Sequence, residues 1–349
     1  MRLLRACRAG CSLTEMASPA RSSAAADAPL VRVPDFFIVG APKTGTTSLH
    51  RTLRAHPQIY MPTLKEPRYL ADDMRPRAEH AEEARELEYP DTMDDYLALF
   101  ADATPEQRAG EASAFYLWSQ TAAASIAELQ PAARIIATLR EPASFLRSLH
   151  LMFLWWGVET ETDLGKAIAL EPARRQGRSV PRQSHRPQLL NYSEHVRFVE
   201  QLRRYDARFA PEQKLVLIYD DFQRDNEGTV REVLRFIGAD EQLPIDVKNV
   251  NVTRRTVRSH RARRLMYALS HGRGPVARST QAAARALSTP RLRGRAARVL
   301  LGRAARSEPP PADDGAMLEL RRRFKPEVIA LSEYLDRDLV SLWGYEDVD

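Results

Sequence analysis

Three short apolar runs stand out along the chain, and each is followed by a stretch with helical periodicity. The runs cover residues 35–40, 134–139 and 214–219. Each has the length and composition of a buried parallel strand. Helices are expected from Thr46 to about Ala55, from about Ala143 onward, and from Thr229 to Ile237. Strands that alternate with helices indicate right-handed βαβ units, so we expect an α/β fold of three layers, a central parallel sheet flanked by helices.

The remaining segments indicate one large domain preceded by a leader. Residues 1–32 are rich in Ala, Ser and Arg and contain no apolar run long enough for a signal peptide or a membrane span, so we expect a disordered leader. Residues 33–349 are expected to form a single domain, in which the charged stretch 75–109 is mostly helical. The segment 315–345 is expected to form C-terminal helices, with apolar residues at helical spacing: Leu320, Phe324, Val328, Leu331, Leu335 and Leu339.

Positive charge is concentrated in one part of the chain. The formal net charge is +6, and no Asp or Glu occurs between Thr253 and Ser307, which predicts a basic helical segment over residues 254–306. Such a surface attracts phosphates, sulfates, nucleic acid or anionic membranes, so charge alone selects no partner. The two cysteines, Cys7 and Cys11, exclude a disulfide framework, and without a second pair they give no zinc site. We therefore expect a cytoplasmic protein.

The first predicted strand leads into a loop with the chemistry of a phosphate site. The segment is Gly40-Ala-Pro-Lys43-Thr44-Gly45-Thr46-Thr47, placed where backbone N–H groups and the helix dipole favour an anion. A nucleotide triphosphatase has Lys directly after the second Gly, together with an acid for magnesium. Here position 46 is Thr and the lysine stands at position 43. ATP or GTP hydrolysis is disfavoured, although a plain turn into a buried helix gives a similar pattern.

The segment from Phe36 to Ile59, FFIVGAPKTGTTSLHRTLRAHPQI, carries a resemblance to a known family. It resembles the 5′-phosphosulfate-binding segment of sulfotransferases that use 3′-phosphoadenosine 5′-phosphosulfate (PAPS), particularly the bacterial and heparan-sulfate-type branch. The resemblance implies the P-loop NTPase-like sulfotransferase fold. It also implies that Lys43 assists departure of the product, 3′-phosphoadenosine 5′-phosphate (PAP), and that the cofactor contacts include Lys43, Thr44, Gly45, Thr46 and Thr47.

The same resemblance covers the next segment, Lys65-Glu66-Pro67-Arg68-Tyr69. It implies that Glu66 is the general base that takes the acceptor proton; a surface Glu paired with Lys65 is the alternative interpretation. The chain departs from the family pattern at Arg68, where His is common. It also departs at Ala112, where heparan-type members have a catalytic Lys after the preceding Glu, so that contribution is absent here.

A second phosphate site is indicated by Arg140 and Ser148. Sulfotransferases bind the 3′-phosphate with an Arg at a strand end and a Ser eight residues later, and this spacing is reproduced here. A strand-end Arg offers a fork of donors to a phosphate, and a helix Ser adds a hydroxyl. Relatives close a basic loop over the cofactor at residues 249–264, where we assign the contact to Arg254. No metal is required.

The acceptor and two other function classes stay open. The predicted acceptor is a hydroxyl or amine of a carbohydrate, a lipid or a secondary metabolite, with contacts expected from residues 155–188. A small-molecule kinase with a degenerate P-loop would instead bind ATP with magnesium. A nucleic-acid-binding protein would use the Arg-rich stretch 254–306, which has few aromatic residues and no recognised reading motif. Peripheral membrane contact is a further option, and the sequence leaves the oligomeric state open.

Overall fold

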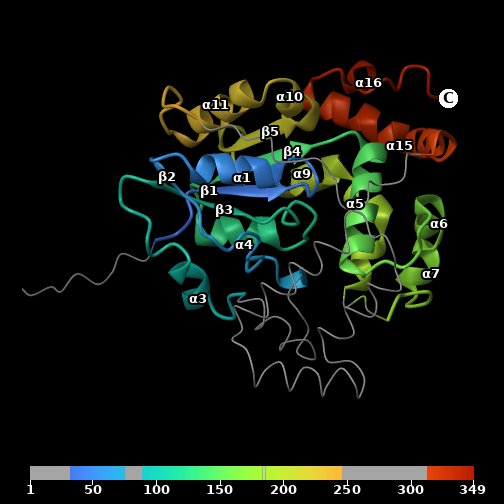
Figure 1. Cartoon of the computed structure of the whole chain (residues 1–349), viewed down its shortest axis with the longest axis horizontal. Helices are drawn as coiled ribbons and strands as arrows, with labels where there is room; N and C mark the ends of the chain where they lie inside the picture. The colour runs from blue at the N-terminus through green and yellow to red at the C-terminus, as the bar shows by residue number, and fades with distance from the viewer. Residues whose placement is uncertain (1–31, 75–88, 183, 185, 246–312) are drawn as a thin grey trace, which may run out of the picture. The chain divides into compact units, whose positions relative to one another are not determined.

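The computed structural model describes residues 32–74, 89–182, 184, 186–245 and 313–349. The described residues form one compact unit built on a five-stranded parallel sheet with the strand order β2-β3-β1-β4-β5 (Figure 1). The strands are β1 (Phe36–Gly40), β2 (Ile59–Tyr60), β3 (Arg108–Ala112), β4 (Arg134–Leu139) and β5 (Lys214–Ile218). Because β1 pairs with β3 on one side and β4 on the other, the carboxyl ends of these three strands meet at one edge.

Helices connect the strands and cover both faces of the sheet. They are α1 (Thr46–Arg54), η1 (Asp72–Met74), α3 (Met93–Ala98), α4 (Ala122–Leu129), α5 (Pro142–Trp156), α6 (Leu164–Ala169), α7 (Glu171–Arg175), η3 (Pro187–Leu190), α8 (Tyr192–His195), α9 (Phe198–Asp206), η4 (Pro211–Gln213), α10 (Tyr219–Arg224), α11 (Asn226–Ile237), α15 (Asp314–Leu335) and α16 (Leu339–Leu342).

Alternate residues of β1 point into two separate apolar cores. Phe36 and Ile38 pack in a cluster with side chains of α1 and α11. Phe37 and Val39 pack in a larger cluster with side chains of α4, α5, α9 and α15. All four side chains are fully buried, which accounts for the continuous apolar run in a strand covered on both faces. The three-layer α/β arrangement predicted from the sequence is confirmed.

Most of the predicted elements are present at nearly the predicted positions. The strands at 36–40 and 134–139, the helix that follows each, and the C-terminal helices α15 and α16 are confirmed. The third predicted strand ends one residue early, because Tyr219 begins α10. Residues 1–31 of the predicted leader 1–32, and the whole basic segment 254–306, lie outside the described residues.

The prediction for residues 75–109 is wrong in its described part. Only α3 is helical there, and Arg108 and Ala109 open strand β3 instead. This strand has no apolar run, yet it is buried because it lies between β2 and β1. Gly110 is required at its centre, since a Cβ atom there would lie 2.1 Å from the Phe36 ring. Among the described helices, none is long and apolar enough to cross a membrane.

Candidate active site

The loop after β1 is shaped to receive an anion at the N-terminus of α1. Gly45 is the N-cap residue with φ 88°, and no side chain caps the helix or places an acid in its first turn. The buried Thr44 hydroxyl donates to the Ala41 carbonyl at 2.6 Å, so this side chain closes the loop and leaves its backbone as the only group for a ligand. Thr46 is buried and Thr47 half-buried in the first turn. The helix dipole therefore faces the loop, and no acid in the first turn of α1 offsets it.

Two cations, Lys43 and Arg140, lie side by side at this edge. Arg140 Nη1 donates to the Lys43 carbonyl at 3.4 Å, its Nε donates to Ser144 Oγ at 3.0 Å, and its guanidinium lies 4.9 Å from the Tyr219 ring centre. Burial, and then the charge of Arg140, lowers the pKa of Lys43, and burial also lowers the pKa of Arg140. Among the described residues, neither cation has a carboxylate within 4.0 Å. Such a pair favours a bound anion.

Ser148 supplies an unused polar group on the same helix face. It follows Ser144 by four residues on α5, which places the two side chains one turn apart on one face. The Ser148 residue is 6% exposed, and its hydroxyl oxygen is buried without a hydrogen-bond partner among the described residues. A buried hydroxyl in a native structure is normally satisfied. This orphaned hydroxyl, one helical turn from the Arg140 partner Ser144, is a donor that a phosphate oxygen would satisfy.

The charge of Glu66 partly opposes the lowering of the Lys43 pKa, so the two side chains lie near each other. The predicted base and the predicted cofactor lysine therefore share one site. Its carboxylate pairs with Lys65 at 2.9 Å and with Arg68 at 2.5 Å. Burial acts to raise the pKa of Glu66, but Arg68 and Lys65 outweigh burial and lower it to about 2. Glu66 is therefore ionised at neutral pH, with both oxygens already paired to cations.

A second carboxyl, Glu111, was given no role by the sequence. It lies at the carboxyl end of β3, is fully buried, and accepts hydrogen bonds from Tyr96 at 2.7 Å and Tyr116 at 3.0 Å. Within the part of the chain that the structure describes, its other oxygen, Oε1, has no hydrogen-bond partner. Burial raises the pKa of Glu111 to about 7. The sequence does contain an acid at the end of a strand, but that strand is too polar to be recognised as a strand from its sequence.

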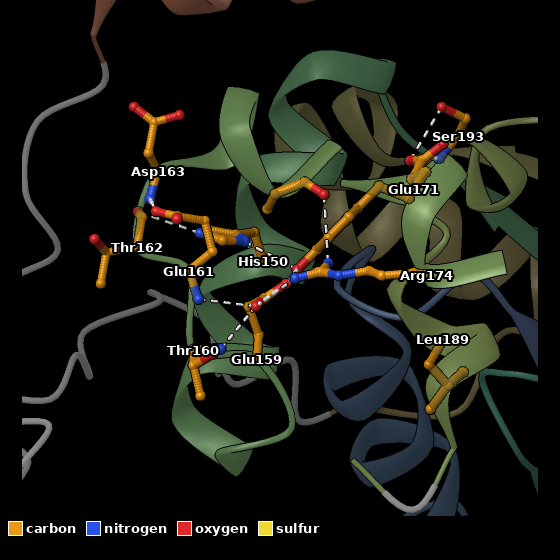
Figure 2. Close-up of polar contacts among 12 residues, drawn as sticks. His150, Glu159, Thr160, Glu161, Thr162, Asp163, Glu171, Arg174, Leu189 and Ser193 are labelled. Atoms are coloured by element: carbon orange, nitrogen blue, oxygen red, sulfur yellow. Dashed lines mark hydrogen bonds and ion pairs between the residues drawn. The ribbon is translucent and has the colours of Figure 1, made fainter. Parts of the chain in front are cut away.

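A further polar network holds the segment after α5 (Figure 2). Glu159 and Arg174 form a fully buried two-pronged ion pair with distances of 2.8 and 2.9 Å. Tyr192 donates to Glu159 at 3.0 Å and also bonds to His150 at 2.9 Å. The network ties α7 to the end of α5, within the stretch 155–188 where acceptor contacts are predicted. His150 is thereby engaged in the structural network.

Comparison with protein families gives a match over residues 34–242 to the sulfotransferase family. The chain belongs to this family. Lys43, Glu66, Arg140 and Ser148 all lie within the matched residues, whereas Arg254 lies beyond them and outside the described structure. The family and fold predicted from the sequence are therefore confirmed. The described residues contain no group of three or more His, Cys, Asp or Glu side chains that could hold a metal ion.

Individual sulfotransferases match different parts of the chain. Carbohydrate sulfotransferase 15 of Homo sapiens is 31% identical over 166 residues, covering 35% of this chain and 27% of that protein. The same protein of Mus musculus is 30% identical over 166 residues with the same coverage. The chain thus spans about a quarter of the length of these relatives. A solved sulfotransferase from Alicyclobacillus acidocaldarius superposes with a TM-score of 0.60 and 25% identity, covering 89% of this chain and 98% of that one.

Proposed function

We propose that this protein transfers a sulfuryl group from PAPS to a hydroxyl or amine of an acceptor. The observation that carries the proposal is the half-buried pair Lys43 and Arg140, which has no carboxylate partner among the described residues. Ser148, with its orphaned hydroxyl, follows one helical turn after Ser144, which bonds to Arg140. Family membership supports the same reaction. Neither a kinase nor a nucleic-acid-binding function is favoured, because the family match covers the phosphate loop itself.

We assign a phosphate-binding role to each polar group at the carboxyl edge of the sheet. PAPS supplies the sulfuryl group when bound and leaves as PAP. The N–H groups at the start of α1, with Thr46 and Thr47, hold the 5′-phosphate, and Lys43 neutralises charge that develops on it. Arg140 and Ser148 bind the 3′-phosphate. Tyr219 and Ser144 hold the Arg140 side chain in place, so little side-chain freedom is lost when a phosphate binds.

Glu66 is proposed as the group that takes the acceptor proton. It is ionised, as a base must be, and it lies near Lys43. A carboxylate held by two cations is a weak base, so its share of catalysis depends on an acceptor hydroxyl displacing Lys65 or Arg68 from one oxygen. Replacing Glu66 by Gln should lower kcat and leave PAP affinity unchanged.

We propose a carbohydrate acceptor. The matched human protein is by name a carbohydrate sulfotransferase. A polar pocket of about 290 Å³ is lined by one aromatic ring, Trp118, and otherwise by planar polar side chains that include Gln120, Gln188 and Asp73. An indole face packs on the C–H face of a sugar, and amide and carboxylate groups bond its hydroxyls.

Ring contacts connect this pocket with the surroundings of Glu66. Arg68, which pairs with Glu66, lies 5.2 Å from the Phe115 ring centre, Phe115 lies 6.2 Å from His195, and His195 stacks on Trp118 at 5.1 Å. Phe115 and His195 are buried, so these contacts couple the Trp118 pocket to Arg68 through the core.

The test is transfer of radiolabelled sulfate from PAPS to a panel of acceptors. The panel comprises desulfated chondroitin, maltoheptaose, 2-naphthol and a glycolipid dispersed in detergent, with ATP and magnesium as a separate arm. Label on a glycan, with release of PAP in EDTA, is the expected result. Label on 2-naphthol alone would overturn the carbohydrate assignment. Phosphorylation from ATP without sulfuryl transfer would overturn the proposed reaction. The predicted cytoplasmic location stays a prediction, testable by cell fractionation.

A further inference from the structure

The segment that carries Glu66 is attached to the end of β3 through every second backbone N–H group. The Glu66 N–H donates to the Ala112 carbonyl at 3.0 Å. The Arg68 N–H donates to the Ser113 hydroxyl at 3.0 Å, and the Leu70 N–H donates to the Tyr116 hydroxyl at 3.1 Å. Two of the three acceptors are thus side chains, so the position of this segment depends on residue identity at 113 and 116.

This segment needs such support because its backbone is in an unfavourable conformation. Glu66 has φ 62° and Arg68 has φ 55°, both in the left-handed region that residues with a Cβ atom rarely adopt. Residues of this kind persist only where the surroundings fix them, and they concentrate at functional sites. Loss of one of the three hydrogen bonds should therefore release the Glu66 carboxylate from its position near Lys43.

Glu111 determines how the Tyr116 hydroxyl can act. A phenol has a single proton, and Tyr116 donates that proton to Glu111 Oε2 at 3.0 Å. The oxygen lone pairs are then directed to the Leu70 N–H. Tyr96 donates to the same carboxyl oxygen at 2.7 Å, and its ring stacks on Tyr69 at 5.1 Å, so a second contact joins Glu111 to the strained segment.

We propose that Glu111 is a positioning residue for sulfuryl transfer: through Tyr116 and Tyr96 it holds the segment Glu66–Leu70 in the conformation that presents Glu66. Glu111 is fully buried, so it acts through the segment and not on the acceptor. Burial raises the pKa of Glu111 to about 7, which agrees with a carboxyl kept in the core for the bonds it accepts. The proposal rests on the proposed function for the role of Glu66, but the attachment of the segment can be measured without it.

The test compares Glu111→Leu, Glu111→Gln and Tyr116→Phe with Tyr60→Phe as the control. Tyr60 donates to the Leu99 carbonyl at 2.9 Å, so the control removes a comparable hydroxyl bond away from the segment. Amide hydrogen exchange of residues 64–72 reports the attachment. PAP titration reports the cofactor site, and transfer to desulfated chondroitin gives kcat and KM.

We expect Glu111→Leu and Tyr116→Phe to speed exchange in 64–72 roughly fivefold to tenfold, the effect of one lost hydrogen bond. The kcat value should fall about tenfold or more, with PAP affinity unchanged within about twofold. Glu111→Gln keeps an acceptor oxygen and should retain most of the exchange protection and most of the kcat. Tyr60→Phe should change neither the exchange of residues 64–72 nor kcat. If Glu111→Leu does not fold, Tyr116→Phe carries the test.

Unchanged exchange in both disruptive variants would overturn the proposal, and so would a loss of PAP affinity that parallels the loss of kcat. Failure of the proposed function looks different. A wild-type protein that neither binds PAP nor transfers sulfate, yet shows the expected exchange pattern, would refute the sulfotransferase activity and leave the attachment of the segment intact.

Discussion

Ser148 gives a prediction in which one substitution changes stability and binding in opposite directions. Its buried hydroxyl has no hydrogen-bond partner in the described part of the chain, and an unsatisfied buried polar group costs about 1–3 kcal/mol. Ser148→Ala should therefore stabilise the protein without ligand by about 1–3 kcal/mol, of which roughly 0.5 kcal/mol is the higher helix propensity of Ala. The same change should weaken PAP binding, because a hydrogen bond to a charged group contributes about 1.5–3 kcal/mol. That loss corresponds to about 10- to 150-fold in Kd.

The assay is urea unfolding with and without PAP, combined with calorimetric titration. Ser125→Ala is the matched control, since Ser125 is also in a helix, α4, and its hydroxyl is satisfied by the Thr121 carbonyl at 3.3 Å. The control should gain no free energy of unfolding beyond the difference in helix propensity between Ser and Ala, and it should bind PAP normally. Destabilisation of the ligand-free protein by Ser148→Ala would show that the hydroxyl has a partner. Unchanged PAP affinity would show that it does not face the phosphate. Either result would refute the reasoning.

Three further predictions concern single positions. Gly45→Ala should lower the free energy of unfolding by roughly 1–2 kcal/mol because of its φ of 88°, and by more because the new Cβ atom would lie 2.8 Å from Phe222; PAP binding should also weaken. The control Gly177→Ala, at φ 73° with nothing within 4 Å, should show the backbone cost alone. Equal losses for the two variants in urea unfolding would exclude the clash with Phe222. Arg174→Met should cost about 3–5 kcal/mol by stranding Glu159 in the core, and a thermal unfolding curve unchanged by it would contradict the buried pair. The pKa of Glu111 is raised from 4.5 to about 7, so the folded protein binds the extra proton and stability should fall by about 3 kcal/mol as pH rises between these values. Glu111→Gln should abolish that decline; its persistence in urea unfolding at pH 4.5 and 8 would contradict the assignment.

The central strands could be predicted because burial on both faces requires a continuous apolar run. Phe36 to Gly40 and Arg134 to Leu139 meet this condition, and each ends at a candidate phosphate contact. Strand β3 could not be found in this way. Its residues Arg108–Ala112 include a charged acid and a glycine, which tertiary packing places in the sheet against local preference.

One part of the candidate site could likewise be predicted from sequence order, and the other part depends on tertiary contacts. Lys43 and Arg140 follow the ends of β1 and β4, and parallel strands bring such positions to one edge, so their proximity followed from order and spacing. The ion pairs of Glu66 and the bonds of Glu111 depend on side-chain directions and on left-handed backbone at Glu66 and Arg68. No periodicity encodes these features. The assignment of Arg254 stays a prediction outside the described residues.

Calorimetric titration with PAP in EDTA, beside ATP with magnesium, tests the central claim that Lys43 and Arg140 form the anion site of a sulfotransferase. We expect magnesium-independent PAP binding by the wild type, no ATP binding, and a loss of about 10-fold or more in affinity for Lys43→Ala and for Arg140→Ala. Lys325→Ala, which removes a surface cation that donates to the Val348 carbonyl at 2.6 Å, is the control and should bind PAP normally. ATP–magnesium binding without PAP binding, or equal PAP affinity in all four proteins, would contradict the account.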